Sequence, residues 1–495
     1  MTEFTRRNFL RTGTSIAALL PFTTACAPAQ ILSASTTPSD SLDGVRMAQL
    51  IAAGDISSLE FTEAAIARAE RVNPQINAIA TPLFDEARAQ AASAPQGVFG
   101  GVPTFIKDLT QWNGAPTKYG SRTYKDFMST RDSAFAAQWR KNGVVVLGKS
   151  TTPEAGLISS TEPVLTGATR NPWDLGRIPG GSSGGAAALT ASRVVPFAQA
   201  SDGGGSIRIP AACCGVFGLK PSRGALIQAR PESGIDLSIK HAVTLTVRDS
   251  AALFAACEDP NGGLTPTGQI LGPSTKRLKI AFAPDPINGA SLDAETRDGI
   301  ERTAELCRSL GHEVIDWSMP VDGNEFTENF LLLWASGAAG LVDQAKAQFP
   351  DTDITSLVEP WTLGLAAEFL ARQDQFDAAQ AYLTAFEPVY HSFFDDIDVI
   401  LTPTVSKLPP AIGVQAPTRP FEELRKEVVD FAAFTAPMNV AGSASMSVPI
   451  QWTDAGLPVG SMFSARRGDD GVLLSLAYEL EAAQPWIGRT PAMLG

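Results

Sequence analysis

Histidine is scarce in this chain, with 3 copies among 495 residues. Only His241, His312 and His391 could therefore supply an imidazole as a general base or a metal ligand. No group of His, Cys and Asp residues shows the spacing of a metal site, so we expect neither a metal nor another cofactor. A nucleophilic enzyme built on this sequence could use a neutral lysine in place of histidine as its base.

Cysteine is also sparse, with copies at positions 26, 213, 214, 257 and 307. These positions show no metal-ligand spacing, and a chain that can bury so large a core is not expected to need a disulfide framework. Cys213 and Cys214 are adjacent in the apolar run IPAACCGVFGL. Their thiols are therefore predicted to be buried and to behave as small hydrophobic groups.

Basic residues are outnumbered, with 39 Lys and Arg against 52 Asp and Glu and a net charge of −13. A groove for nucleic acid must neutralise phosphates, so this balance disfavours a nucleic-acid partner and favours a small or neutral substrate. Long charge runs, heptads and short repeats are missing after about residue 42. We therefore expect one domain over residues 43–495, preceded by a linker at 30–42. The sequence leaves the oligomeric state open.

The N-terminal segment lacks an apolar run long enough to span a bilayer, because its apolar stretch covers only residues 16–22. The paired Arg6 and Arg7 precede this stretch and resemble the twin-arginine pattern of bacterial export of folded proteins. Small residues follow, and cleavage is predicted after Ala29. Residues 1–29 are thus predicted to be an export signal, which implies a periplasmic or other envelope location.

The same segment has a second interpretation as a lipoprotein signal. The stretch TTAC, which ends at Cys26, resembles a degenerate lipoprotein box without the usual leucine. A lipid on Cys26 would then be the protein's only attachment to a membrane. Cleavage after Ala29 and lipidation of Cys26 both stay open at this point.

Helical and strand patterns alternate along the rest of the chain. Ser57 and Glu60 form a capping box, and the helix that they begin should end near Val72 because Asn73-Pro74 follows. A turn and then a helix are expected from His241. Strands are expected at 101–109, 143–150, 277–284 and 398–404, and helices at 293–310 and over much of 325–395. This alternation predicts an α/β fold, with helices on both faces of a large, twisted, parallel or mixed sheet.

The stretch GVVVLGKS matches the spacing of a phosphate-binding loop, with Lys149 and Ser150 in register. Such a loop needs flexible residues between its glycines and a helix after them. Here the intervening residues are strand-like, and Pro153 follows. We therefore disfavour nucleotide binding.

The stretch GGSSGG at 180–185 contains the G-x-S-x-G pattern around both Ser182 and Ser183. This pattern could be the nucleophile elbow of an α/β-hydrolase, which should follow an apolar strand and requires a histidine. The preceding residues Arg177-Ile178-Pro179 do not form such a strand pattern. This interpretation is weak, but one of the three histidines could serve it.

Several separated blocks, taken together, resemble the amidase signature family. GGSSGG is followed by DGGGSIR and by PAACCGVFGLKPSRG, and all three are preceded by GVPTFIKD, which carries Lys107. LGKSTTPEAG, TRNPWD, DVILTPT, APMNVAGSASMSVP and GLPVG also resemble family blocks. The resemblance covers most of the chain after the export signal and implies the fold of that family, a large twisted mixed β-sheet covered by helices.

The resemblance implies a catalytic trio. Ser206 would be the acylated nucleophile, Ser182 a bridging serine on a cis peptide bond, and Lys107 the base. The resemblance also implies an oxyanion hole of backbone amides, those of Gly203, Gly204, Gly205 and Ser206.

Lysine can act as a base only when it is neutral. Its ordinary pKa of about 10.4 must fall by about three units, which corresponds to about 4 kcal/mol of differential solvation. Lys107 follows Phe105 and Ile106 in an apolar strand, where burial would disfavour the charged form. The alternative is that Lys107 lies at a solvated strand end.

Two departures from the family pattern bear on function. Members often carry Asp-Thr-Gly-Gly-Ser or Asp-Ile-Gly-Gly-Ser where this chain has DGGGS, so Gly203 could reshape or widen the oxyanion hole. The family's tRNA-linked amidotransferase subunits work in the cytoplasm, which the export signal disfavours here. DGGGSIR, STEP and SARRGDD are closer to the branch that holds cyclic-oligoamide hydrolases and other free-standing amidases.

These observations predict an exported amidase for a small aryl, alkyl or cyclic amide. An esterase with the same trio and a non-catalytic envelope binding protein of the same fold are the alternatives. Phe330, Trp334 and Trp361 could form the wall of an acyl pocket, although a place in the hydrophobic core is the favoured interpretation.

Overall fold

The computed structural model describes residues 42–229 and 234–494. The expected export signal at 1–29, including Cys26 and Ala29, lies outside the described residues, as does all but the last residue of the expected linker at 30–42. Both stay predictions. In the part of the chain that is described, no helix is long and apolar enough to cross a membrane.

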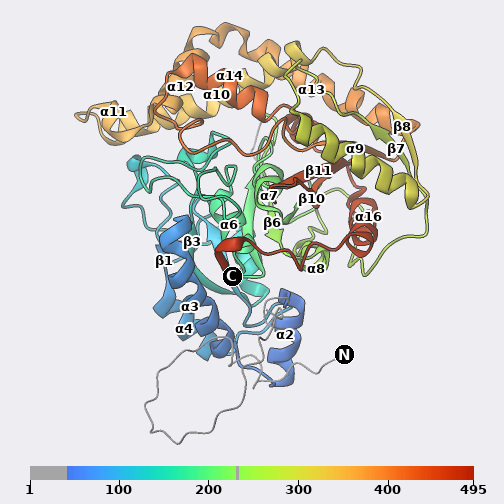
Figure 1. The fold of residues 1–495 in the computed structure, drawn as a ribbon. Helices are drawn as coiled ribbons and strands as arrows, with labels where there is room; N and C mark the ends of the chain where they lie inside the picture. Colours follow the sequence, from blue (N-terminus) through green and yellow to red (C-terminus); the bar gives the residue numbers. More distant parts are fainter. Residues whose placement is uncertain (1–41, 230–233, 495) are drawn as a thin grey trace, which may run out of the picture.

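The centre of the molecule is a mixed eight-stranded sheet, in the order β4-β6-β5-β10-β11-β9-β7-β8 (Figure 1). Neighbours are antiparallel from β4 to β9, and the last two pairs are parallel. The strands are β4 (Phe197–Asp202), β5 (Phe217–Lys220), β6 (Ile239–Thr244), β7 (Lys279–Phe282), β8 (Glu313–Asp316), β9 (Val399–Pro403), β10 (Ser445–Trp452) and β11 (Pro458–Ser464). The predicted α/β fold with a large mixed sheet is confirmed.

A second, smaller sheet carries Lys107. It has the order β1-β3-β2, with β1 (Ile79–Pro82) antiparallel and β2 (Pro103–Lys107) parallel to β3 (Val145–Ser150). The strand pattern of GVVVLGKS thus prevails over the phosphate-loop interpretation. Lys149 is fully buried in β3, where its Nζ lies 3.0 Å from Thr117 Oγ1.

Helices cover both faces of the large sheet. Successive residues of a strand face opposite sides, and β11 shows which helix lies on each side. Ser461 Oγ lies 2.8 Å from Thr303 Oγ1 of α9 (Ala294–Ser309), whereas a Cβ on Gly460 would lie 2.3 Å from Ala212 Cβ of α7 (Arg208–Cys214). α9 and α7 therefore pack on opposite faces.

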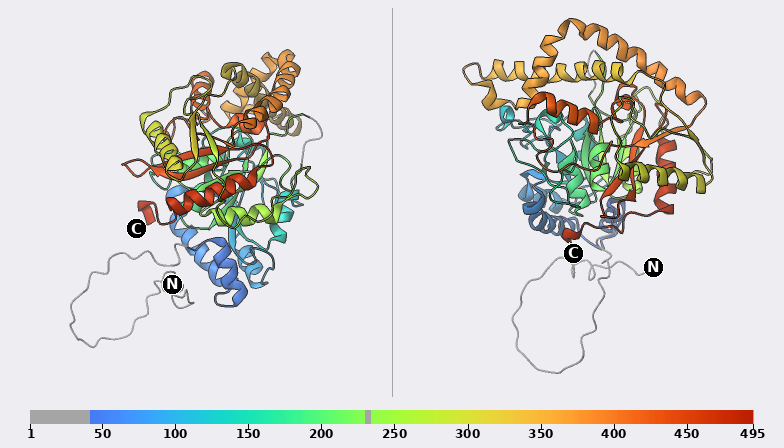
Figure 2. Two further views of the ribbon diagram at one scale, coloured as in Figure 1. Left: turned by 90° about the vertical axis from the view of Figure 1, so that its right-hand side faces the viewer. Right: turned by 45° about the horizontal axis from the view of Figure 1, so that its top comes forward.

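Five helices form a cap that extends along one side of the molecule, drawn in yellow to orange-red at the top of Figure 1 and turned forward in Figure 2. The first four of them confirm the helical pattern expected between 325 and 395. Their bounds are α10 (Gly323–Gln348), α11 (Ile354–Leu357), α12 (Pro360–Ala371), α13 (Phe376–Ser392) and α14 (Phe421–Phe431).

Further helices complete the fold. These are α2 (Gly44–Ala53), α3 (Ser58–Ile76), α4 (Phe84–Ala92), α5 (Ala134–Lys141), α6 (Gly184–Ala191), α8 (Val247–Cys257), α15 (Ala436–Val440) and α16 (Asp470–Ala483), with short 3-10 turns at Arg122–Tyr124, Glu154–Gly156, Gln373–Gln375, Phe393–Asp395 and Ala492–Leu494. Among these helices, α6 and α15 are largely buried.

Two local predictions were wrong. The predicted capping box of Ser57 and Glu60 is present, but the helix continues past Val72 to Ile76 with Pro74 inside it. A proline in the last turn removes only one hydrogen bond, and the Asn73 side chain accepts the amides that follow the helix. The second error concerns His241, which lies in β6 and not in a turn, because its strand pairs with both β4 and β5.

The predicted burial of Cys213 and Cys214 is confirmed. Cys213, Cys214, Cys257 and Cys307 are buried and free of disulfides, and burial raises the pKa of each thiol. Within the described ranges, no three His, Cys, Asp or Glu residues are grouped so as to hold a metal ion.

Candidate active site

Lys107 lies at the C-terminal end of β2 and is fully buried. Its Nζ is 2.7 Å from Ser182 Oγ and 2.8 Å from Ser183 Oγ. Ser201 at the end of β4 contributes its Oγ at 3.1 Å and its carbonyl oxygen at 3.4 Å. The solvated strand end is therefore the wrong alternative for Lys107, whose amine is surrounded by serine oxygens.

Burial determines the protonation of Lys107. It lowers the pKa of Lys107 to about 7, and the charge of Asp202 opposes this shift without overcoming it. A substantial fraction of the amine is consequently neutral at neutral pH, which is the state that can accept a proton from a serine hydroxyl.

Ser182 lies in the loop between Pro179 and α6, and the Gly181–Ser182 peptide bond is cis, as the resemblance implies. Ser182 and Ser183 are almost completely buried. Gly181 lines the same cavity as Ser206, which is 8% exposed in the turn between β4 and α7. The structure therefore places Lys107 against Ser182, and Ser182 follows Gly181, which lines the cavity that Ser206 also lines.

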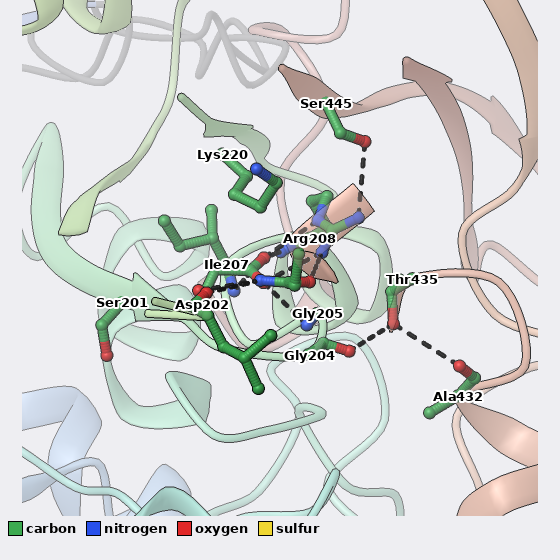
Figure 3. Close-up of polar contacts among 12 residues, drawn as sticks. Ser201, Asp202, Gly204, Gly205, Ile207, Arg208, Lys220, Ala432, Thr435 and Ser445 are labelled. Carbon is green, nitrogen blue, oxygen red and sulfur yellow. Dashed lines mark hydrogen bonds and ion pairs between the residues drawn. The ribbon is translucent and has the colours of Figure 1, made fainter. Parts of the chain in front are cut away.

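The turn that carries Ser206 is held by a buried ion pair (Figure 3). Asp202 accepts hydrogen bonds from Arg208 Nε and Nη2, each at 2.9 Å, and both side chains are fully buried. Asn439 Nδ2 donates to the same carboxylate at 2.9 Å, and the Ile207 amide at 3.1 Å. Burial acts to raise the pKa of Asp202, but the contacts with Arg208 outweigh it and hold this pKa well below its usual value.

The peptide group between Gly204 and Gly205 is held at both ends. Thr435 Oγ1 donates to the Gly204 carbonyl oxygen at 2.5 Å, and the Gly205 amide donates to Asp202 Oδ1 at 2.7 Å. Only glycine fits at position 205, because φ is +129° and a Cβ would lie 2.3 Å from Thr435 Oγ1. Figure 3 shows Thr435 and Asp202 on either side of this peptide.

These two hydrogen bonds correct the expected role of Gly205 in the oxyanion hole. A backbone amide carries one hydrogen, and that of Gly205 is already donated to Asp202, so Gly205 does not fit the expected role. The amides of Gly203, Gly204 and Ser206 donate to no other residue within the described ranges. These three stay the predicted donors to a substrate oxyanion.

A cavity opens beside Ser206 and Gly204. Phe330 and Trp334 of α10 and Trp361 of α12 line it. Trp361 also belongs to a buried apolar cluster, and Phe330 and Trp334 pack against such clusters, so the core and the cavity-wall interpretations both hold. Val428, Val429, Ala432, Ala433, Ala436 and Pro437 also line the cavity. No charged side chain occurs among the described residues that line the cavity.

The nucleophile-elbow interpretation has no support in the geometry. Ser182 and Ser183 follow a loop instead of a strand. The histidines all have other partners: His241 Nε2 lies 3.0 Å from Ser250 Oγ, His312 Nε2 lies 3.0 Å from Glu479 Oε2, and His391 Nε2 lies 2.9 Å from the Ala441 carbonyl oxygen.

Sequence reasoning missed the polar neighbours of the trio. Ser183 and Ser201 contact Lys107, and Asp202 and Arg208 fix the glycine turn. One signal was available, since Asp202 and Arg208 begin and end DGGGSIR. A charged residue at each end of a buried glycine run predicts an ion pair across the turn, because neither charge is stable alone in the interior.

A family model and several curated proteins match most of this chain. A family model described as Amidase matches residues 60–474. A putative amidase AmiC of Mycobacterium tuberculosis is 37% identical over 90% of this chain and 95% of its own length. The 6-aminohexanoate-cyclic-dimer hydrolase of Paenarthrobacter ureafaciens is 31% identical over 91% of this chain and 97% of its own length.

Two solved structures are similar over nearly all of the chain. A 6-aminohexanoate cyclic dimer hydrolase complexed with substrate has a TM-score of 0.84 at 30% identity, with 92% of this chain and 100% of that chain covered. A bacterial aryl acylamidase of the amidase signature family has a TM-score of 0.82 at 25% identity, with 91% and 99% covered.

Proposed function

We propose, from the premise that this chain belongs to the amidase signature family and is an amidase, that it hydrolyses carboxamides through an acyl-enzyme on Ser206. The observation that carries this proposal is the contact of 2.7 Å between Lys107 Nζ and Ser182 Oγ beside the cavity that Ser206 lines. A buried amine with its pKa lowered to about 7 is a base that can activate a serine.

Acylation begins when Ser206 Oγ attacks the amide carbonyl carbon. Ser182 accepts the Ser206 proton while it gives its own proton to neutral Lys107, and the carbonyl oxygen becomes an oxyanion. The amides of Gly203, Gly204 and Ser206 are the donors proposed for that oxyanion. The ammonium of Lys107 then returns a proton through Ser182 to the amide nitrogen, the C–N bond breaks, and the amine leaves.

Deacylation repeats the sequence with water as the nucleophile. Water attacks the Ser206 ester and loses a proton through Ser182 to Lys107. The new oxyanion collapses, the bond to Ser206 Oγ breaks, and Lys107 returns the proton to Ser206 through Ser182. The carboxylic acid is released, and the starting protonation state is restored.

The substrate that we propose is a small uncharged aryl, alkyl or cyclic amide. The absence of charged side chains among the described residues of the cavity supports it, because a charged group would lose its water without gaining a partner. Trp334 and Phe330 offer apolar contact, worth about 25 cal/mol per Å² of buried surface. The likeness to a hydrolase named for a cyclic amide supports the cyclic class.

We also propose that the enzyme works in the periplasm or elsewhere in the cell envelope. The paired Arg6 and Arg7 support export in the folded state, and Cys26 offers a site for a lipid anchor. The test is Arg6→Lys combined with Arg7→Lys in a bacterial host that has the twin-arginine pathway. The double variant should stay in the cytoplasm. Normal amounts of the mature protein in the envelope would contradict the assignment.

The direct test of function combines a covalent probe with a substrate panel. A fluorophosphonate should label the purified protein at Ser206, as mapped by mass spectrometry, and Ser206→Ala should abolish the label. An adduct on Ser182 would instead favour the nucleophile elbow. Anilides, alkyl amides and lactams should be hydrolysed faster than glutamine, and without ATP. Hydrolysis of esters alone would indicate an esterase, and the absence of both label and turnover would indicate a binding protein.

A further inference from the structure

Two glycines before the nucleophile face aromatic rings of the cap. Gly203 and Gly204 do not adopt the left-handed backbone region, so their conformation alone would admit a side chain. A Cβ on Gly203 would lie 3.3 Å from Trp334 Cζ3, and a Cβ on Gly204 would lie 3.1 Å from Phe330 Cζ. A side chain at either position would therefore be in tight contact with a ring, which would have to shift by a few tenths of an ångström.

The Trp334 ring is held where it meets Gly203. Its Nε1 donates to the Leu157 carbonyl oxygen at 3.1 Å, and Trp361 Nε1 donates to the same oxygen at 3.0 Å. The Phe330 ring packs against Trp334 with 5.7 Å between ring centroids. A Cβ at position 203 would have to displace a ring that is fixed by a hydrogen bond and by packing.

This contact lies beside the proposed reacting atoms. Trp334, Phe330 and Leu157 line the cavity together with Gly204 and Ser206. The edge of the Trp334 ring therefore limits the space next to the turn that carries the nucleophile. In the proposed reaction the scissile carbonyl carbon bonds to Ser206 Oγ, so the acyl group enters the cavity that Ser206 and Trp334 both line.

We propose that Trp334, seated on Gly203, is the specificity-determining residue that excludes acyl groups branched next to the scissile carbonyl. This inference rests on the proposed amidase reaction at Ser206. Narrow or flat acyl groups fit along the ring, whereas a branched group overlaps it. Differences of one or two methyl groups in a closed pocket change kcat/KM by about 10- to 200-fold.

The first experiment measures kcat/KM for propionyl, isobutyryl and pivaloyl 4-nitroanilides. The wild type should discriminate against the branched groups, and Trp334→Ala should raise the pivaloyl-to-propionyl ratio by at least about tenfold. Trp334→Leu is a second variant that keeps more of the packing, and it should move the ratio in the same direction. Phosphonate labelling of Ser206 and the melting temperature confirm that each variant is folded.

The second experiment tests the contact with Gly203 directly. Gly203→Val should lower kcat/KM for the propionyl anilide by at least about tenfold in the wild type, and by less than about threefold in the Trp334→Ala background, because the obstructing ring is then absent. Gly337→Ala is the matched control in α10, since a Cβ at Gly337 meets nothing within 4 Å. It should leave all rates unchanged.

The outcomes separate this inference from the proposed reaction. The specificity role is overturned if both Trp334 variants lose kcat/KM equally on every anilide. It is also overturned if Gly203→Val lowers kcat/KM equally with and without Trp334. The proposed reaction stands in both cases. If the wild type shows no hydrolysis and no labelling of Ser206, the proposed reaction is overturned, and the specificity role is overturned with it.

Discussion

Protonation of Lys107 should switch off acylation below about pH 7. With an ordinary pKa of 10.5, about one lysine in 3,000 would be neutral at pH 7. Burial lowers the pKa to about 7, so about half of the Lys107 amines are neutral there. The structure therefore raises the reactive fraction by about three orders of magnitude. We expect kcat/KM to fall tenfold per pH unit below about 7 and to reach a plateau above it.

The assay measures kcat/KM for a non-ionising anilide between pH 5 and 9. The inflection caused by Lys107 must be distinguished from one caused by a second lysine. Lys220 is also fully buried with its pKa lowered to about 7, and the charge of Asp470 raises its pKa. Asp470→Asn should therefore lower the pKa of Lys220 and leave the pKa of Lys107 unchanged. Ser201→Ala removes an oxygen 3.1 Å from Lys107 Nζ and should lower the Lys107 pKa by about 0.5 units, the equivalent of about 0.7 kcal/mol.

The inflection should move to lower pH in Ser201→Ala and stay in place in Asp470→Asn. A profile that moves with Asp470→Asn instead would assign the inflection to Lys220. A flat profile, or an inflection near the ordinary lysine pKa, would refute the argument that burial prepares Lys107 as the base.

Three further predictions concern the same site. Ser206→Ala should abolish turnover. Ser182→Ala and Lys107→Ala should each lower kcat by orders of magnitude at an unchanged melting temperature. Turnover at the wild-type rate in any of these variants would remove that residue from the mechanism. Thr435→Val should lower kcat about 10- to 100-fold with little change in KM, because the Gly204 carbonyl loses its donor; Thr435→Ser should restore the rate, and failure of this rescue would argue against a positioning role. Dialysis against a chelator should leave the rate unchanged, and restoration of a lost rate by zinc would contradict the serine mechanism.

The sequence predicts the parts of the site that are local. Apolar neighbours mark the strand that buries Lys107, and glycines and serines mark the turns that carry Ser182 and Ser206. Each of these signals spans fewer than ten positions and indicates only a strand or a turn; the roles of Lys107, Ser182 and Ser206 come from the resemblance to the family. The order and spacing of the blocks then imply the family, and with it the large mixed sheet.

The remainder of the site depends on residues that are distant in sequence. Thr435 is 231 positions from Gly204, and Trp334 is 177 positions from Leu157, with which it shares a hydrogen bond. Aromatic residues in a helix are as typical of a core as of a cavity wall, and only the tertiary structure distinguishes the two. The helix that continues through Pro74 has the same cause, since contacts made beyond its end outweigh a local stop signal.

Asp202 links the two halves of the site electrostatically. Its carboxylate fixes the glycine turn by accepting the amides of Gly205 and Ile207, yet its negative charge also favours the charged form of Lys107. Arg208 contacts the same carboxylate at 2.9 Å and keeps it ionised, although burial alone would raise its pKa. The turn thus keeps an ionised carboxylate as its anchor, while burial outweighs the charge of Asp202 and lowers the pKa of Lys107 to about 7.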